Sequence, residues 1–260
     1  MFERTLTISA MTVAAATTAL GLVTVLSART TLLAQTSPSG QTSLAAPGPR
    51  TSAAGRSRLF PPGSLGLLEA PDRNQWQKPD LIMDALKIAE GDVVAELGVA
   101  GGWFTARLAR RVGPNGLVYA EDIQSIMLEA TRRRLQREGL TNVRTVLGTP
   151  TDPKLPPGLD AVLIADAYRE MDDPIRPEVI HLLLKNAAAA LKANGRLGIV
   201  DYTAGGGGPG PAADERVEPE KVIAAAESAG LILRAREQVP PFQFLLVFGR
   251  VATPPARRTF

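Results

Sequence analysis

The fold of this chain is decided by the stretch Val93-Val94-Ala95-Glu96-Leu97-Gly98-Val99-Ala100-Gly101-Gly102-Trp103-Phe104-Thr105. It begins with a short apolar run, passes through one carboxylate into small residues, and enters a segment where Phe104, Leu108 and Val112 recur at helical spacing. This order predicts a strand, a tight turn and a helix. Small residues at such a turn let a ligand approach bare peptide groups at the helix N-terminus, where amide donors favour polar or anionic groups. We expect a nucleotide-like ligand; the simpler alternative is that the glycines only pack the strand against the helix.

The residues after this helix strengthen the ligand interpretation. Pro114-Asn115-Gly116 predicts a turn, and residues 117–120 predict a second strand that ends in Glu121-Asp122. In an open parallel sheet, the carboxyl edge near the first turn is the usual ligand crevice. Asp122 follows Gly98 by about two dozen residues, so its carboxylate is placed to accept hydrogen bonds from ribose hydroxyls.

The remaining apolar patterns predict an alternation of strands and helices. Strands are expected at 143–147, 160–165, 196–200, 231–236 and 243–251, and helices at 79–88, 125–138, 177–192 and 219–229. Alternating strands and helices imply a parallel sheet with right-handed crossovers. The last two strands are joined by a connection too short for a parallel crossover, so the final strand should be antiparallel. The expected fold class is α/β, with a Rossmann-like seven-stranded, mostly parallel sheet, helices on both faces and an antiparallel C-terminal hairpin strand.

Charge and composition exclude several classes of function. The net charge is only +3, and the cationic cluster Arg132-Arg133-Arg134 with Arg137 lies on a predicted helix, where a solvated face is the simplest explanation. We therefore expect no nucleic-acid partner. The chain has no cysteine, so it can form neither a disulfide framework nor a thiolate metal site, and no metal site is expected. The single histidine, His181, sits inside an apolar helical stretch and is expected to pack or to lie at the surface, and not to act in catalysis.

The N-terminal residues are expected to lie outside the folded domain. Residues 5–28 carry no charge, so 1–34 is predicted to be a signal or membrane-anchor segment and 35–60 a disordered linker. The domain then covers 61–252, with a tail at 253–260. Arginines after residues 5–28 would leave an anchored domain in the cytoplasm; the alternative is export after signal cleavage.

These features together resemble the class I S-adenosylmethionine-dependent methyltransferases, over roughly residues 66–251. In that family a glycine-rich loop follows strand one, an acidic residue ends strand two, an acidic or polar residue ends strand four, and a terminal hairpin makes the last strand antiparallel. The first motif, residues 96–102, has Ala100 where glycine is usual, a change expected to cost space but not chemistry. Residues 73–80, 148–153 and 240–244 are similar to a group of bacterial predicted methyltransferases.

The resemblance implies S-adenosylmethionine as cofactor and a role for each matching residue. Gly98 and Gly102, with Ala100 between them, would face the methionyl part, and Glu96 would support the loop or meet the amino group. The residues expected on the nucleoside are Asp122 for the ribose diol, Ile123 beside the adenine, and Thr149 and Asp152 at the adenine edge. Asp166 and Tyr168 would lie beside the sulfonium and the acceptor. They are the candidates for a base, which is needed only if the acceptor must lose a proton; alternatively, the Asp166 carboxylate only caps the next turn.

Two other functions compete with methyl transfer to a small-molecule acceptor. A nicotinamide-dependent oxidoreductase uses a similar turn and ribose carboxylate, but residues 98–102 lack the Gly-x-Gly-x-x-Gly spacing. A membrane-tethered protein that binds the cofactor without catalysis would also explain residues 5–28. The sequence indicates neither the acceptor nor the oligomeric state, while membrane association through residues 5–28 is one expectation. Arg73, Trp76 and Gln77 are placed either to cap the crevice or to pack.

Overall fold

A computed structural model describes residues 59–205 and 207–251 of the chain. The expected signal or anchor segment at 1–34, the linker at 35–60 except for its last two residues, and the tail at 253–260 lie outside this part. Within the described residues, no helix is both long and apolar enough to cross a membrane.

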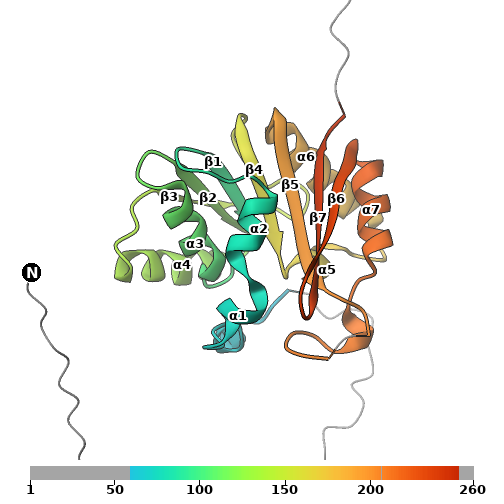
Figure 1. Ribbon diagram of the computed structural model, residues 1–260, viewed down its shortest axis with the longest axis horizontal. Coiled ribbons are helices and arrows are strands. Elements are labelled where there is room, and N and C mark those ends of the chain that lie inside the picture. The colour runs from blue at the N-terminus through green and yellow to red at the C-terminus, as the bar shows by residue number, and fades with distance from the viewer. Residues whose placement is uncertain (1–58, 206, 252–260) are drawn as a thin grey trace, which may run out of the picture. The chain divides into compact units, whose positions relative to one another are not determined.

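The described residues form a seven-stranded sheet in the order β3-β2-β1-β4-β5-β7-β6 (Figure 1). The strands are β1 Val93–Leu97, β2 Leu117–Asp122, β3 Val143–Leu147, β4 Leu159–Ala165, β5 Leu191–Tyr202, β6 Leu231–Val239 and β7 Gln243–Arg250. All neighbouring pairs from β3 to β5 are parallel, whereas β7 is antiparallel to both β5 and β6. The predicted fold class and the antiparallel C-terminal hairpin strand are therefore confirmed.

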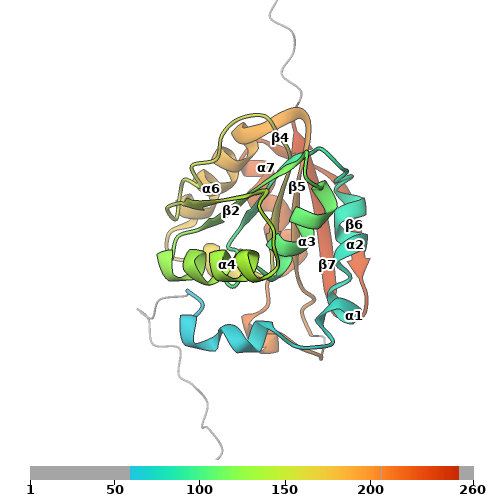
Figure 2. The same ribbon diagram turned by 90° about the vertical axis from the view of Figure 1, so that its left-hand side faces the viewer.

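Helices cover both faces of the sheet (Figures 1 and 2). They are α1 Arg73–Gln77, α2 Pro79–Ala85, α3 Trp103–Val112, α4 Ser125–Arg137, α5 Tyr168–Met171, α6 Pro177–Ala190 and α7 Pro219–Ser228, with short 3-10 turns η1 Pro62–Leu68 and η2 Ala213–Glu215. The first core cluster packs α6 and α7 on the sheet, and the second packs α2 and α3 on the opposite face. Adjacent strand residues divide between the clusters, as with Val162 in the first and Leu163 in the second, because successive side chains in a strand point to opposite faces. This explains why the central strands are apolar without alternation.

The boundary between α6 and β5 differs from the expectation. The helix was expected to run to about residue 192, but it ends at Ala190, and the strand begins at Leu191 instead of Arg196. Leu191 pairs with Leu159 of β4, and the register then shifts so that Arg196 pairs with Ala161. Pairing with β4 thus draws residues with weak strand propensity into the sheet, because tertiary context overrides local propensity.

Candidate active site

The turn after β1 has the backbone that its small residues allow. Gly98 and Gly102 have φ values of +74°, and a Cβ on Gly98 would lie 2.8 Å from the Cβ of Ala167. Both positions therefore require glycine. Ala100 also has a positive φ, +47°. The departure from glycine was expected to cost only space, but its principal cost is backbone strain.

The same turn meets the end of β2, as the sequence predicted. The amides of Gly98 and Val99 donate to the Glu121 carbonyl at 2.9 and 3.2 Å. The Ala100 amide donates to Oδ2 of Asp122 at 3.1 Å, and the Gln124 amide donates to Oδ1 at 2.9 Å. Burial raises the pKa of the Asp122 carboxyl above its ordinary value. The peptide groups of the turn and the Asp122 carboxylate thus converge at the carboxyl edge of β1 and β2.

Two more carboxyl groups are buried beneath this turn. Thr105 donates its hydroxyl to Glu96 Oε2, and burial raises the pKa of Glu96 to about 8. Burial, followed by the nearby Asp122, raises the pKa of Glu121 to about 8. Oε1 of Glu121 is buried without a hydrogen-bond partner and lies against Gly148, where no Cβ would fit. Buried polar atoms are normally paired, so this oxygen and the Asp122 carboxylate fit a ligand that supplies hydrogen-bond donors.

In the loop after β3, polar side chains form hydrogen bonds within the loop itself. Oγ1 of Thr149 accepts from the Asp152 amide at 3.0 Å, and Oδ1 of Asp152 accepts from the Lys154 amide at 2.8 Å. Thr149 is half-buried and Asp152 is exposed. Both residues lie at the carboxyl edge, as expected, but these side-chain oxygens are already used in closing the loop. Ile123, which follows β2, is partly exposed.

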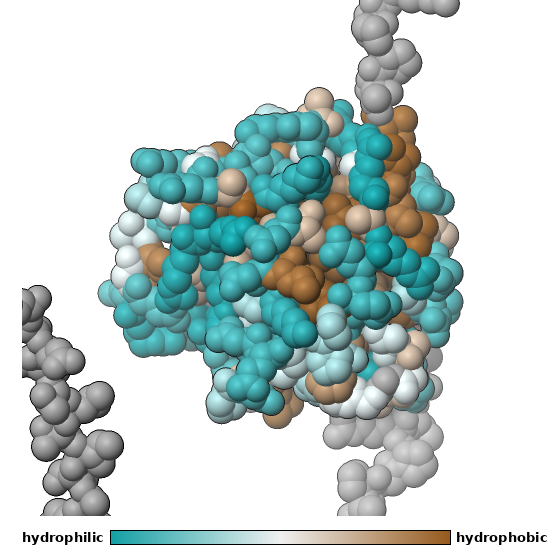
Figure 3. Space-filling model, in the orientation of Figure 1, coloured by the Kyte–Doolittle hydropathy of each residue, from teal (hydrophilic) through white to brown (hydrophobic). Residues whose placement is uncertain are grey.

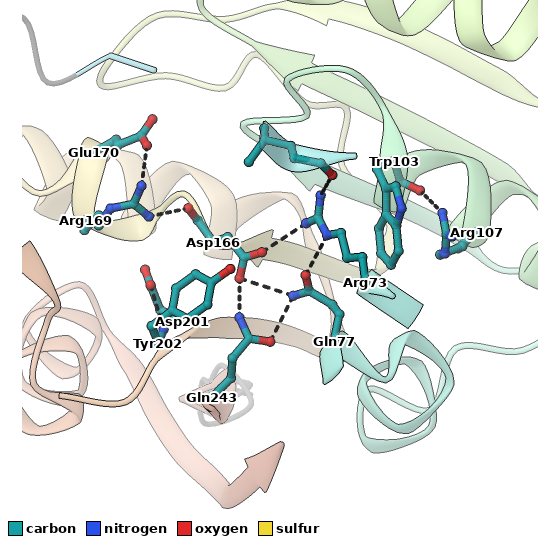
Figure 4. A network of polar contacts seen from close by, with 11 residues as sticks. Arg73, Gln77, Trp103, Arg107, Asp166, Arg169, Glu170, Asp201, Tyr202 and Gln243 are labelled. Carbon is teal, nitrogen blue, oxygen red and sulfur yellow. Dashed lines mark hydrogen bonds and ion pairs between the residues drawn. The ribbon is translucent and has the colours of Figure 1, made fainter. Parts of the chain in front are cut away.

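Asp166 forms the centre of a polar network at the end of β4 (Figure 4). Arg73 pairs with its Oδ2 at 3.0 Å, whereas Gln77 at 3.2 Å and Gln243 donate their amides to its Oδ1. Gln77 also donates to Gln243 at 3.1 Å. Asp166 has a φ of +58°, which aspartate tolerates better than most residues. We call Arg73, Gln77, Asp166 and Gln243 the clasp, because it joins α1, β4 and β7 across the sheet edge.

The two tyrosines near Asp166 lie in different surroundings. Tyr168 is only 1% exposed and packs in the core cluster with α6, and burial raises the pKa of its hydroxyl. The structure therefore does not bring its side chain to the crevice. Tyr202, at the end of β5, lies on the clasp side with its ring centroid 6.0 Å from that of Trp76. Sequence reasoning did not assign Tyr202 or Gln243 to the site. Tyr202 ends β5, and Gln243 lies beside it because β7 pairs with β5.

The first described residues form a strap, residues 59–69, across the crevice. The Phe60 amide donates to Glu170 at 3.2 Å, and the Phe60 carbonyl accepts from Gln124 at 3.1 Å. Glu170 follows β4 and Gln124 follows β2, so the strap passes over the tip of β1, which lies between these strands. At the end of the strap, Glu69 pairs with Arg134, which also donates to the Gly101 carbonyl at 2.8 Å.

The contacts of Arg134 correct the expectation for the α4 arginine cluster. The α4 arginine cluster was interpreted as a solvated face, but the Arg134 side chain is only 14% exposed and holds the strap to the first turn. Within the crevice, the Met171 methyl group lies against Gly98, 2.9 Å from where a Cβ would be. The strap and Met171 therefore both border the crevice.

Comparisons with known proteins agree with this geometry. Residues 94–195 match the family described as "Methyltransferase domain". A stretch of 101 residues is 30% identical to protein-L-isoaspartate O-methyltransferase of Methanococcoides burtonii, covering 38% of this chain and 49% of that protein. Another of 130 residues is 29% identical to the ubiquinone/menaquinone biosynthesis C-methyltransferase of Pasteurella multocida, covering 49% and 46%. The chain thus spans about half the length of these curated relatives.

Solved structures share the same architecture. A SAM-dependent methyltransferase from Aquifex aeolicus superposes with a TM-score of 0.68 and 24% identity, over 74% of this chain and all of that one. Its likeness shows the fold. Strand order, the glycine turn meeting Asp122 and the domain match define the class I S-adenosylmethionine-dependent methyltransferases. Residues 94–195 match a methyltransferase domain, and the matched relatives and solved structures imply S-adenosylmethionine as the cofactor.

Proposed function

We propose that this chain transfers a methyl group from S-adenosylmethionine to a small-molecule acceptor. The observation that carries the proposal is the convergence of the turn at Gly98–Gly102 with the Asp122 carboxylate, which accepts the Ala100 amide. The peptide groups at the helix N-terminus suit the polar tail of a nucleoside cofactor, and the buried carboxylate suits its ribose hydroxyls. The partnerless Glu121 oxygen adds a second acceptor in the same place.

On the cofactor side, each residue has a role that its position supports. Asp122 would accept the ribose hydroxyls, and Gly98, Ala100 and Gly102 would present the turn to the methionyl part. Glu96, fully buried and bonded to Thr105, would hold the turn on α3. The adenine would lie beside Ile123, near the backbone of the loop that Thr149 and Asp152 close.

On the acceptor side, we assign positioning to the clasp. S-adenosylmethionine supplies a methyl group that is already electrophilic, so alignment of the acceptor contributes much of the rate. Three side chains, those of Arg73, Gln77 and Gln243, already donate to the Asp166 carboxylate, so both of its oxygens are used in contacts within the chain. Asp166 therefore holds α1 over the crevice, and neither Asp166 nor the core-buried Tyr168 has the freedom that a base requires.

A small acceptor is supported by how closely the chain covers the crevice. The strap crosses one side, and the aromatic pair Trp76 and Tyr202 lies beside the clasp on the other. Aromatic side chains bind flat, partly apolar molecules well. The matched relatives' names refer to protein L-isoaspartate, to ubiquinone/menaquinone biosynthesis and to transfer RNA, so the acceptor has to be inferred from this chain's own residues.

The test is calorimetric titration of the full chain with S-adenosylmethionine and, separately, with NADH. We expect binding of the first only, and Asp122→Asn should weaken it roughly 10- to 100-fold, because a hydrogen bond to a charged group is worth about 1.5–3 kcal/mol. Asp214→Asn, an exposed carboxylate in η2, is the matched control and should change nothing. Preferential NADH binding would favour the oxidoreductase. Normal S-adenosylmethionine affinity without label transfer to a panel of small phenols and quinols would favour the non-catalytic binding protein.

For localisation, we propose that residues 5–28 anchor the chain with its domain on the cytoplasmic side, where S-adenosylmethionine is made. The uncharged run and the arginines that follow it support this orientation. Membrane fractionation of the untagged chain, followed by protease treatment of sealed vesicles of both orientations, tests it. Recovery of a shortened chain outside the cell would instead show export.

A further inference from the structure

A second depression lies on the side of α1 away from the clasp. It is a groove of about 730 Å³ between the α1–α2 segment and α3, and its lining contains four basic residues, Lys78, Arg107, Arg110 and Arg111, against one acidic residue, Asp80. Its apolar wall is formed by Pro79, Leu81 and Met83. The face of the molecule shown in Figure 3 is mainly hydrophilic, with apolar residues visible between the charged ones. The groove thus combines cationic groups with an apolar surface, within the size range of small-molecule sites.

The basic residues of the groove differ in how their charges are compensated. Arg110 pairs with Glu138 at 2.6 Å, and Arg111 pairs with Asp84. Arg107 has only neutral partners in the described part of the chain. Its Nε and Nη2 both donate to Oδ1 of Asn74, at 2.9 and 2.7 Å, and its Nη1 donates to the Trp103 carbonyl at 2.7 Å. Arg107 is therefore an oriented cation that makes no ion pair within the described residues, and Glu138 is the nearby carboxylate that partly offsets its charge.

The surroundings of Arg107 destabilise its charged form. Partial burial and then the neighbouring cations Arg73, Arg110 and Arg134 lower the pKa of its guanidinium to about 10. The group stays protonated at neutral pH but is less stable as a cation than in water. An oxyanion within hydrogen-bonding distance would relieve both effects, because charge-assisted hydrogen bonds to a guanidinium are strong in partly desolvated sites.

We propose that this groove binds a small molecule through an oxyanion, phosphate or carboxylate, with Arg107 as its anchor and Lys78 as a second contact. A nucleic acid fits less well, because Arg110 and Arg111 are already paired with carboxylates. The site does not depend on the proposed methyl transfer. It nevertheless adjoins the clasp: the Arg107 Cζ lies 3.3 Å from the Trp103 ring centroid, and the Arg73 Cζ lies 4.2 Å from the same ring (Figure 4).

The fluorescence of Trp103, whose indole contacts both Arg107 and Arg73, gives a direct measure of binding. The chain has two tryptophans, so Trp76→Phe leaves Trp103 as the reporter. Inorganic phosphate is titrated into the full chain carrying this change, and its emission is compared with that in sodium chloride of equal ionic strength. We expect a saturable change with a dissociation constant on the order of 1 mM, the strength of one anion on one or two cations. Phenyl phosphate should bind several-fold more tightly than phosphate if the apolar wall contributes.

Two variants and a matched control locate the binding. Arg107→Gln should raise the phosphate dissociation constant at least 10-fold, and Lys78→Gln should raise it about 3-fold. Arg144→Gln, an exposed change of equal charge on β3, should leave it unaltered. Calorimetry repeats the titration without relying on fluorescence, and Lys78→Gln serves if Arg107→Gln fails to fold. No saturable response beyond chloride, or equal losses in all three variants, would overturn the proposal. A single-stranded oligonucleotide that binds more tightly than phenyl phosphate would also overturn it.

Discussion

Glu121 offers a quantitative test of the carboxyl groups buried beneath the first turn. Its side chain is 2% exposed, and one carboxyl oxygen has no partner. Burial and the neighbouring Asp122 raise its pKa from 4.5 to about 8. We consider Glu121→Gln, which keeps the shape of the side chain and removes its ionisation.

The sign of the effect follows from the two pKa values. Below about pH 4.5 the carboxyl is protonated in both the folded and unfolded chain, so it adds no pH dependence. Between about pH 4.5 and 8 the unfolded chain ionises first and binds fewer protons, so the wild type loses stability as pH rises. Each pH unit in this window costs about 1.4 kcal/mol, which gives about 3 kcal/mol at pH 7. Glu121→Gln should therefore be more stable than the wild type by about 2–4 kcal/mol at pH 7.5 and nearly equal to it at pH 4.5.

Urea unfolding followed by circular dichroism, at several pH values in that window, measures the difference between variant and wild type. Glu96, Glu170 and Asp201 also have raised pKa values, but they are common to both proteins and largely cancel. Glu129→Gln on exposed α4 is the control and should show a difference that is small and flat with pH. If the stability difference for Glu121→Gln were equally flat, the carboxyl would be ionised and solvated in the folded chain, and the reasoning would be refuted.

Three further changes test other parts of the structure. Lys87 follows the end of α2 at a φ of +55°, where glycine is preferred, so Lys87→Gly should raise the urea midpoint by an amount equivalent to about 0.5–1 kcal/mol; a decrease would contradict the strain. Arg73→Met and Asp166→Asn should each destabilise the chain by about 3 kcal/mol, and the double variant by clearly less than the sum; additivity would show that the ion pair is not coupled. Gly102→Ala should lower the melting temperature, because a Cβ there would lie 2.8 Å from a Thr131 methyl group. Adding Thr131→Ser, which removes that methyl group, should restore part of the loss. No restoration would show that backbone strain alone causes the loss.

The sequence predicted the sheet well because its signals are local and repeated. The run at 143–147 appears as β3 with the expected bounds, and the short connection before Gln243 correctly implied an antiparallel last strand. The α6–β5 boundary was wrong because Leu191 joins the sheet through a partner, Leu159, that lies about thirty residues earlier. Local sequence patterns do not predict a register shift between two strands.

The candidate site divides in the same way. The meeting of Gly98 with Asp122 could be predicted, since the ends of neighbouring parallel strands share one edge. The clasp could be predicted only in part: Arg73 and Gln77 were considered as caps, but Gln243 lies 166 residues beyond Gln77, and only the tertiary fold brings them within 3.1 Å. The neighbours of a buried side chain also cannot be derived from strand order: Tyr168 packs in the core cluster with α6, whereas Tyr202, which is buried as well, packs beside Trp76.

The extent of the family match explains why the class of the chain is clearer than its methyl acceptor. The region shared with the methyltransferase domain family ends at residue 195, so it contains the glycine turn, Asp122 and Asp166. The side chains that donate to the Asp166 carboxylate, which are Arg73, Gln77 and Gln243, all lie outside that region, as does the strap. The residues proposed for the cofactor thus lie inside the matched region, whereas the side chains that hold Asp166 and the strap lie outside it. Substitutions at Trp76, Tyr202 and Gln243 should therefore change acceptor preference more than cofactor affinity, because these side chains lie on the clasp side and not at the tips of β1 and β2.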